Sequence, residues 1–364
     1  GPLFLADTTI NFNPTAEEVV GVVKMVHKAV KRLRITPRIA LLSYSNFGSS
    51  RGEEARKMSK ATTILHENYP EIQVDGEMQA NFAMNKDLLN EIFPFGIFPL
   101  YLKYLKKIPY IITEHWTGYH TPYFKDISFY QKLISKIIVK KASFICPVTN
   151  DLKKSLINFG LKGNYNVVEN VVDTQKFKPA FIENKLFSIV HISNMLDEHK
   201  NISGILNVVK KLQTSIPDFK LKLIGSNSSH YKQYAIKQNI NLNHIDFINH
   251  IPHKEIIKHL QTANLFLLFS NFENLPCVIL ESFSCGTPVI SSNVGGISEF
   301  FPDNFGKLIN AGNEDELESE IINFYNRKYN IASKQEMHNY SEKHFSYNTI
   351  AKKFSEIYYK TLDL

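Results

Sequence analysis

The order of apolar and polar positions predicts a chain of alternating strands and helices. Residues 265–270 are almost continuously apolar, as in a parallel strand that is buried on both faces, and residues 187–193 also read as a strand. Residues 14–34 place valines three or four positions apart, which predicts an amphipathic helix. Residues 39–45 and 111–115 are further strand-like runs. This alternation indicates an α/β fold class with Rossmann-like layers.

The same reasoning predicts further strands at 3–10, 72–75, 220–225 and 288–292 and further helices at 58–68, 86–92 and 346–364.

The most informative segment is residues 271–300, which follows one of the buried strands. Its two carboxylates, Glu273 and Glu281, lie eight residues apart. Pro276 suits the first turn of a helix, where a missing N–H costs nothing, and Gly286 suits the end of that helix. Glu273 would therefore lie in a loop beyond a strand, and Glu281 on the helix that comes next.

Both carboxylates are expected at a ligand-binding edge. In an open α/β sheet, ligands bind beyond the carboxyl ends of the strands, so Glu273 and Glu281 should face that crevice. Amides at the helix start could meet an anion or a hydroxyl. The spacing alone fits equally well a capped surface helix with two solvated glutamates.

The wider pattern is more specific than the spacing. It reads E-N-L-P-x-V-x-x-E-x-x-x-x-G-x-P-V-I and ends in G-G-x-x-E, without a gap over about thirty residues. It resembles the donor-sugar signature of retaining GT-B glycosyltransferases of family 4 type. The resemblance implies that Glu273 holds sugar hydroxyls and Glu281 the nucleotide ribose. It places Asn274 and Leu275 in the donor-binding segment, and Glu299 matches the glutamate that closes the motif.

Three further residues match the family in the expected order. Lys200, which follows a strand, matches a lysine that holds the donor phosphates, although a solvated loop lysine is the alternative. Asn194 stands where many relatives carry an arginine, so one phosphate contact differs. His115 ends a strand where relatives carry a histidine that faces the reacting sugar. The resemblance thus implies His115 and Glu273 as catalytic residues.

The reaction that the resemblance implies is transfer of a hexose from a nucleotide sugar to a hydroxyl acceptor, with retention of configuration. It implies an oxocarbenium-like transition state and neither a metal nor a cofactor, since the nucleotide sugar is a substrate. The acceptor could be lipid-linked or a surface glycan.

The first 95 residues follow a different pattern. Their segments ADTTINFNPTAEEV, PRIALLSYSNFGSS and VDGEMQANFAMN resemble the phosphate acetyltransferase-like domain of some bacterial malic enzymes. The last strand–helix units of that family, which carry its active-site segment, are not expected here, so acyl transfer is not expected either. Ser43, Ser45 and Gly48 are therefore interpreted as structural residues.

The junction between the two parts lies at residues 93–98, where the triplet IFP occurs twice within a few residues and no flexible linker separates the parts. We interpret the chain as a chimera, by recombination or by faulty sequence assembly, in which both abutting sheets are truncated and can pair into one makeshift sheet. The expected organisation is a phosphate acetyltransferase-like fragment at 1–95, a partial GT-B acceptor domain at 96–173, a complete nucleotide-sugar-binding domain at 174–345, and a C-terminal helix at 346–364 that packs back on the N-terminal region.

Composition separates the same two parts. Residues 1–95 hold eleven basic and eleven acidic side chains, whereas residues 96–364 hold 31 and 24, so the net charge of +7 belongs to the second part. The excess includes lysines in the helices expected in the partial acceptor domain, interleaved with aromatic residues. This face could lie on anionic lipid or simply be solvated. These residues are Lys103, Lys106, Lys107, Lys132, Lys136, Lys140 and Lys141, with Tyr101, Tyr104, Phe129 and Tyr130. Nucleic acid is not an expected partner, because no recognition motif accompanies the charge.

Other bulk features point to the cytoplasm, with the inner face of the membrane as a second location. No apolar run reaches the length of a membrane span, and the start of the chain does not read as a signal peptide. The three cysteines, Cys146, Cys277 and Cys285, lack metal-ligand spacing and are expected to be reduced packing residues.

Two rival functions remain open. One is a phosphate acetyltransferase or malic-enzyme-like fragment, against which the absence of that family's last strand–helix units counts. The other is a protein that binds nucleotide but is catalytically inactive. Measuring nucleotide binding with and without turnover separates the second from a working, or an impaired, glycosyltransferase.

Overall fold

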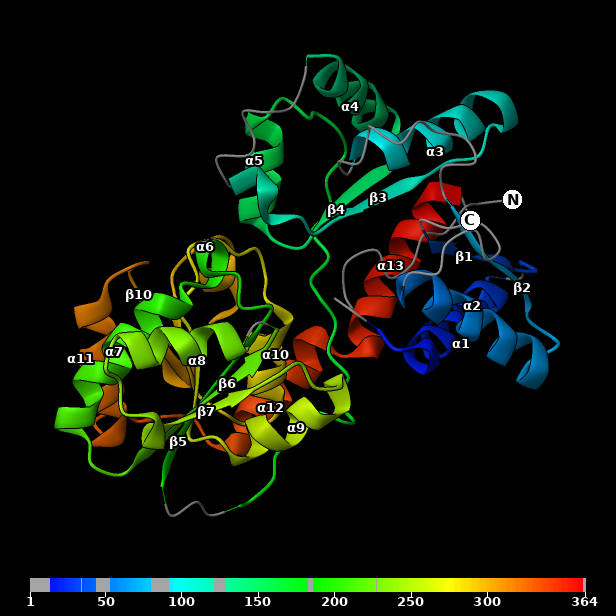
Figure 1. Ribbon diagram of the computed structural model, residues 1–364. Helices are drawn as coiled ribbons and strands as arrows, with labels where there is room; N and C mark the ends of the chain where they lie inside the picture. Colours follow the sequence, from blue (N-terminus) through cyan, green and yellow to red (C-terminus); the bar gives the residue numbers. More distant parts are fainter. Residues whose placement is uncertain are drawn as a thin grey trace. The chain divides into compact units, whose positions relative to one another are not determined.

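The computed structural model describes residues 14–33, 35–43, 53–79, 92–120, 129–182, 186–226 and 228–362. The contacts divide the chain into two compact units (Figure 1). Unit 1 comprises residues 1–112, 126–145 and 160–164, and unit 2 comprises residues 113–125, 146–159 and 165–364. Each unit is described by itself. None of the described helices is long and apolar enough to span a bilayer.

A parallel sheet forms the centre of unit 2. Its six described strands are β5 (Phe187–Ser193), β6 (Phe219–Gly225), β7 (Ile245–Ile248), β8 (Leu265–Leu268), β9 (Val289–Ser292) and β10 (Gly306–Ile309). They lie in the order β10-β9-β8-β5-β6-β7, and every neighbouring pair is parallel. The chain begins the sheet at β5, adds β6 and β7 on one side, and then crosses to β8 on the other. The order of strands therefore reverses between β5 and β8, where an open sheet leaves a crevice beyond the strand ends.

Helices cover both faces of this sheet. Alternate strand residues such as Ile189, Leu221 and Leu265 share one buried cluster with side chains of α7, α8 and α11. Residues of the opposite parity, such as Val190 and Phe266, are equally buried and so face the other layer, where α9 and α10 contact the sheet. The helices of unit 2 are α5 (Asn150–Asn158), α6 (Asp197–Lys200), α7 (Ile202–Ser215), α8 (Ser228–Lys237), α9 (His253–Thr262), α10 (Cys277–Ser284), α11 (Glu314–Tyr325), α12 (Lys334–Phe345) and α13 (Tyr347–Leu362).

The predicted elements of unit 2 match the structure closely, with small shifts at their ends. The strand predicted at 265–270 ends at Leu268. Pro276 is the N-cap of α10 rather than a residue of its first turn, in an extended conformation that precedes the helix. Gly286 follows the helix with a φ of +72°, as a glycine just past a helix end should.

Unit 1 holds a small α/β assembly near its N-terminus. It consists of α1 (Ala16–Arg32), β1 (Arg38–Ser43), α2 (Glu53–Asn68) and β2 (Gln73–Gln79), and β1 pairs with β2 in parallel. The valine stripe of α1 is buried against α2 and both strands, and Thr15 and Glu18 form a capping box at the start of α1. The helix predicted at 58–68 begins earlier, at Glu53.

The junction between the two predicted parts lies inside a helix. This helix, α3 (Ile92–Lys106), runs through Pro94 and Pro99 and contacts α4 (Phe129–Lys141). The strands beyond it, β3 (Ile111–Glu114) and β4 (Phe144–Pro147), form a two-stranded sheet of their own. The expectation of one makeshift sheet is therefore wrong for the described strands, because β1–β2 and β3–β4 are separate sheets. The strand predicted at 3–10, Ser45, Gly48 and the helix predicted at 86–92, except Ile92, lie outside the described residues.

Candidate functional site

The reversal point of the sheet in unit 2 carries two of the predicted site residues. Lys200 ends α6, shortly after β5, and Glu273 lies in the loop after β8. Because β5 and β8 are neighbours, their carboxyl ends bring the two loops together. Lys200 Nζ and Glu273 form an ion pair, in which both side chains are largely buried.

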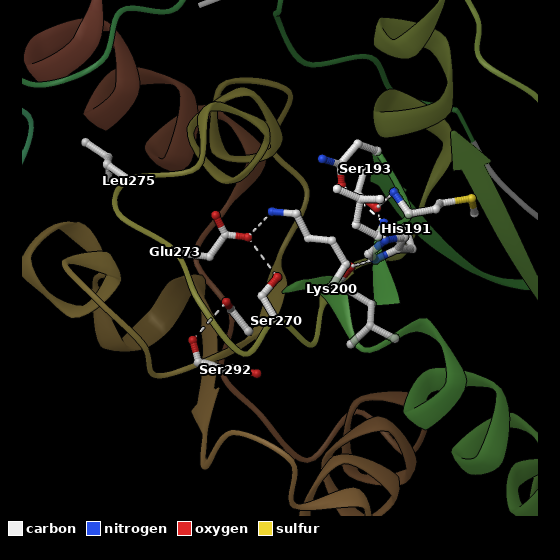
Figure 2. A network of polar contacts seen from close by, with 12 residues as sticks. His191, Ser193, Lys200, Ser270, Glu273, Leu275 and Ser292 are labelled. Carbon is white, nitrogen blue, oxygen red and sulfur yellow. Dashed lines mark hydrogen bonds and ion pairs between the residues drawn. The ribbon is translucent and has the colours of Figure 1, made fainter. Parts of the chain in front are cut away.

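Glu273 is held by two donors on one oxygen. Figure 2 shows Lys200 and Ser270 pointing at Glu273 Oε1. Ser270 Oγ donates a hydrogen bond of 2.8 Å to this oxygen. Among the described residues, Oε2 has no hydrogen-bond partner. The carboxylate is therefore fixed in place by Oε1 and can accept a ligand hydroxyl through Oε2.

A buried histidine supports the loop that leads to Lys200. His191 Nδ1 lies 2.9 Å from the carbonyl oxygen of Leu267, and Nε2 lies 2.7 Å from Ser193 Oγ. Because a carbonyl only accepts, Nδ1 carries the hydrogen, and Nε2 must accept from the Ser193 hydroxyl. Ser193 Oγ in turn accepts the N–H of Met195. This chain links β8 through β5 to the loop that leads to Lys200.

That loop contains unusual backbone conformations. Met195 and Asn201 have φ values of +54° and +47°, and Asn201 Oδ1 accepts from the backbone N–H of Gly204 at the start of α7. Gly225 ends β6 directly beside the loop, where a Cβ would lie 1.9 Å from the carbonyl oxygen of Ser193. The close approach of the two strand ends therefore requires glycine.

Asn194 shapes the same loop. Its Oδ1 accepts the N–H of Leu196 at 3.3 Å, and its side chain is half-buried. Its predicted donor contact therefore stays a prediction.

His115 belongs to a ring of polar contacts with the motif. Asn170 Nδ2 donates to the carbonyl oxygen of Leu275, which fixes the amide orientation, so Asn170 Oδ1 must accept from His115 Nδ1 at 2.9 Å. Asn274 Nδ2 donates to the carbonyl oxygen of His115 at 2.7 Å. Burial lowers the pKa of His115. The imidazole is thus neutral at pH 7, and its Nε2 is an acceptor.

Glu281 has a partner that the sequence did not reveal. It lies on α10, is buried, and its Oε1 is 2.7 Å from Nε2 of His253, the first residue of α9. The His253 ring lies 5.1 Å from the ring of Phe177. Glu281 is thus held by His253 at the sheet edge, apart from the ion pair of Lys200 with Glu273.

The glycine turn and Glu299 join the motif to α5. A Cβ on Gly295, which has a φ of +57°, would lie 1.9 Å from the carbonyl oxygen of Glu273. Glu299 accepts the backbone N–H groups of Asn150 and Asp151, at 2.8 and 2.7 Å, at the start of α5. Glu299 is therefore a helix cap.

Glu114 is a site residue that the sequence analysis missed. It is buried at the end of β3, and its Oε1 accepts the N–H groups of His115 and Trp116, each at 2.9 Å. Burial raises its pKa to about 7, opposed by those two hydrogen bonds. A glutamate inside the apolar strand at 111–115 was the available signal.

The thiols fit a packing role. Burial raises the pKa of Cys277 to about 12 and also raises that of Cys146, so neither is a thiolate at neutral pH. Within the described ranges, no group of three or more His, Cys, Asp or Glu residues could hold a metal ion.

Comparison with known proteins identifies two different families in this chain. The family model described as glycosyl transferases group 1 matches residues 172–344, and the model described as phosphate acetyl/butaryl transferase matches residues 1–97. The resemblance of each part is thereby confirmed. Residues 172–344 form a group 1 glycosyltransferase domain, and the N-terminal part is phosphate acetyltransferase-like.

Relatives of known identity show the same division. The NADP-dependent malic enzyme of Haemophilus influenzae is 44% identical over 94 residues, which are 26% of this chain and 12% of that protein. A phosphatidylinositol N-acetylglucosaminyltransferase polypeptide of Arabidopsis thaliana is 25% identical over 225 residues, 60% of this chain and 49% of that protein. The chain thus spans about an eighth of the malic enzyme and about half of the plant transferase polypeptide.

Solved structures share the fold of the chain. The Anabaena protein HepE in complex with UDP-glucose has a TM-score of 0.66 at 16% identity, covering 98% of each chain. The sucrose-phosphate synthase of Thermosynechococcus elongatus has a TM-score of 0.66 at 17% identity, covering 90% of this chain and 99% of that one. The α/β architecture with parallel sheets is therefore that of GT-B glycosyltransferases.

Proposed function

We propose that unit 2 binds a nucleoside diphosphate sugar and that the chain is a retaining hexosyltransferase whose transfer step is impaired. The observation that carries this proposal is the Lys200–Glu273 ion pair at the reversal point of the sheet. Nucleotide ligands of open α/β sheets bind at this point. A cation and a carboxylate there offer groups for a phosphate and for sugar hydroxyls.

Each charged residue of the donor site suits one part of the nucleotide sugar. Lys200 is the cation for the diphosphate, and binding would exchange its contact with Glu273 for one with a phosphate oxygen. Glu273, released from Lys200 but still held by Ser270, would accept sugar hydroxyls. Glu281 would accept the ribose hydroxyls. Asn274 and Leu275 position this segment through their contacts with His115 and Asn170.

The neutral His115 fits a binding role in the transfer step. Its Nε2 would accept a hydrogen bond from a hydroxyl group of the reacting sugar while Asn170 holds the imidazole ring. As the glycosidic bond to the diphosphate breaks, Lys200 would stabilise the negative charge of the departing phosphate. A phosphate oxygen would then take the proton of the attacking hydroxyl on the same face of the sugar, which gives retention.

We propose uridine as the base and a glucose-type hexose as the donor sugar. The similar structures of HepE, which are in complex with UDP, with UDP and glucose, or with UDP-glucose, support this choice. Their fold and their coverage of this chain support it.

We propose that transfer is impaired because the first 97 residues match another family. Transfer requires both reactants to be held in near-attack geometry. The N-terminal segment matches a family that is described by a different transfer reaction. Acetyl transfer by that segment is the less favoured function, since it spans a small share of its relatives.

The acceptor is proposed to be lipid-linked. On α3 and α4 of unit 1, exposed apolar side chains alternate with lysines, as on a face that lies against anionic lipid. The exposed members include Tyr101, Tyr104, Leu105, Tyr130, Leu133 and Ile137. Such an acceptor requires the enzyme to lie in the cytoplasm, at the inner face of a membrane.

Calorimetric titration with UDP tests the donor site. Glu281→Ala should weaken binding by about 1.5–3 kcal/mol, the scale of a hydrogen bond to a charged group. Glu356→Ala, a matched change at an exposed glutamate of α13, should leave the affinity unchanged. Equal affinities of the parent and Glu281→Ala for UDP would remove the ribose role. If the chain binds UDP but does not release UDP from UDP-glucose when acceptors are present, it is a nucleotide-binding protein without transferase activity.

A further inference from the structure

A cleft in unit 2 lies beside the proposed donor site without including its residues. It has a volume of about 500 Å³, within the usual range of small-molecule sites. One wall is the loop Trp116–Gly118, directly after His115, and the other is the segment Leu196–His199, directly before Lys200. Because Lys200, Glu273 and Glu281 do not line it, the cleft offers space for a second reactant.

The aromatic wall of the cleft is built rigidly. A Cβ on Gly118 would lie 2.0 Å from an atom of the Trp116 ring, so the indole rests directly on this glycine. Tyr119 packs edge-on against Trp116 at 5.2 Å, and Tyr119 in turn packs against Phe159. The carboxylate of Glu114 accepts the backbone N–H of Trp116. These contacts hold a large apolar surface in one orientation at the edge of the cleft.

The opposite wall carries two carboxylates, Asp197 and Glu198, between Leu196 and His199. Asp197 accepts from both the N–H and the hydroxyl of Ser203, at 2.8 and 2.7 Å, which fixes its carboxylate. Glu198 is exposed. Among the described residues, the lining contains neither lysine nor arginine. Carboxylates accept hydrogen bonds from hydroxyl groups and repel anions. This wall therefore favours a neutral polyhydroxy ligand over an anionic one.

We infer that this cleft binds a neutral sugar ring of the acceptor, with the apolar face of the ring on Trp116 and its hydroxyls toward Glu198 and Asp197. An aromatic side chain provides a large contact surface, and the few polar groups opposite it provide orientation. This inference rests on the proposed function, because it assigns the second substrate of the same site. It adds that an anionic acceptor ring is excluded.

The chain contains a single tryptophan, so the emission of Trp116 reports this cleft directly. Titration with methyl α-glucoside should change the emission in a saturable manner, with or without UDP. Methyl α-glucuronoside, the same ring with a carboxylate, should bind at least about tenfold more weakly because of the acidic wall. UDP calorimetry on the same sample tests the donor site separately, so either proposal can fail alone.

Two variants distinguish a sugar subsite from an unrelated quenching effect. Gly118→Ala should displace the indole and weaken glucoside binding by about tenfold, with UDP affinity retained. Gly21→Ala, where the added Cβ meets nothing within 4 Å, is the matched control and should behave as the parent. Glu198→Lys, at an exposed position, should abolish the preference for glucoside over glucuronoside even if Gly118→Ala fails to fold.

Three results would overturn the inference. One is the absence of a saturable response to methyl α-glucoside in both the emission and ligand NMR line widths. Another is equal binding of both glycosides in the parent. The third is a response to UDP-glucose alone, which would assign the cleft to the donor sugar.

Discussion

His191 allows a quantitative test of the buried polar chain beneath Lys200. Its side chain is fully buried, and burial lowers its pKa from the ordinary 6.5 to about 4, assisted by the charge of Lys200 and opposed by the hydrogen bond to Leu267. The folded state therefore keeps His191 neutral at pH values where the unfolded chain is already protonated. As far as His191 is concerned, the free energy of unfolding is highest above pH 6.5 and decreases as the pH falls toward about 4.

The magnitude follows from the size of the shift. Each pKa unit corresponds to about 1.4 kcal/mol, so a shift from 6.5 to about 4 removes about 3 kcal/mol from the free energy of unfolding. His191→Gln keeps one donor and one acceptor but cannot titrate, so it should lack this acid-dependent loss. His191→Leu leaves Leu267 O and the Ser193 hydroxyl without their partner, which should cost about 2–4 kcal/mol at pH 7.

Urea unfolding followed by Trp116 emission provides the assay, since this tryptophan belongs to unit 2. The free energy of unfolding is compared at pH about 7 and about 4 for the parent and for His191→Gln. Subtracting the two acid-induced losses cancels the other histidines and the carboxylates. If His191→Gln loses as much stability on acidification as the parent, the buried neutral histidine does not explain the acid sensitivity.

Three other outcomes are expected. Gly295→Ala should destabilise unit 2 by at least about 2 kcal/mol and reduce UDP affinity, because it strains a left-handed residue and pushes against the Glu273 backbone; normal stability and affinity would refute this. Glu299→Ala should lower the free energy of unfolding by about 0.5–2 kcal/mol and increase hydrogen exchange at the start of α5; unchanged exchange there would refute the capping role. Limited proteolysis should cut first between residues 81 and 99 and leave a resistant C-terminal fragment; exchange there as slow as in β8 would mean one integrated domain.

Unit 2 could be predicted well because its signals are local in the sequence. The apolar run that contains β8 lies between Asn264 and Ser270, and α10 begins after a proline and ends two residues before a glycine. The family resemblance placed Lys200 and Glu273 in loops that follow two strands, and the observed strand order explains their contact.

The residues that were missed act through long-range contacts. His191 bonds to Leu267 and Asn170 to Leu275, 76 and 105 residues away, and His253 meets Glu281 from another helix. None of these pairs leaves a periodic pattern. Glu114 was missed because its one local signal, a carboxylate within an apolar strand, does not show whether the side chain is buried.

The N-terminal part was predictable in its elements but not in its assembly. The helix α1 follows its valine stripe and its capping box. The pairing of β1 with β2, and the separate sheet of β3 and β4, depend on edge hydrogen bonding between strands, which the apolar pattern does not encode.

A crystal structure of the chain with bound UDP is the decisive test of the donor site. We expect the diphosphate beside Lys200 Nζ, with the Lys200–Glu273 contact opened, and the ribose hydroxyls within hydrogen-bond distance of Glu281. UDP ordered away from the reversal point between β5 and β8, or bound there with neither Lys200 nor Glu281 in contact, would contradict it.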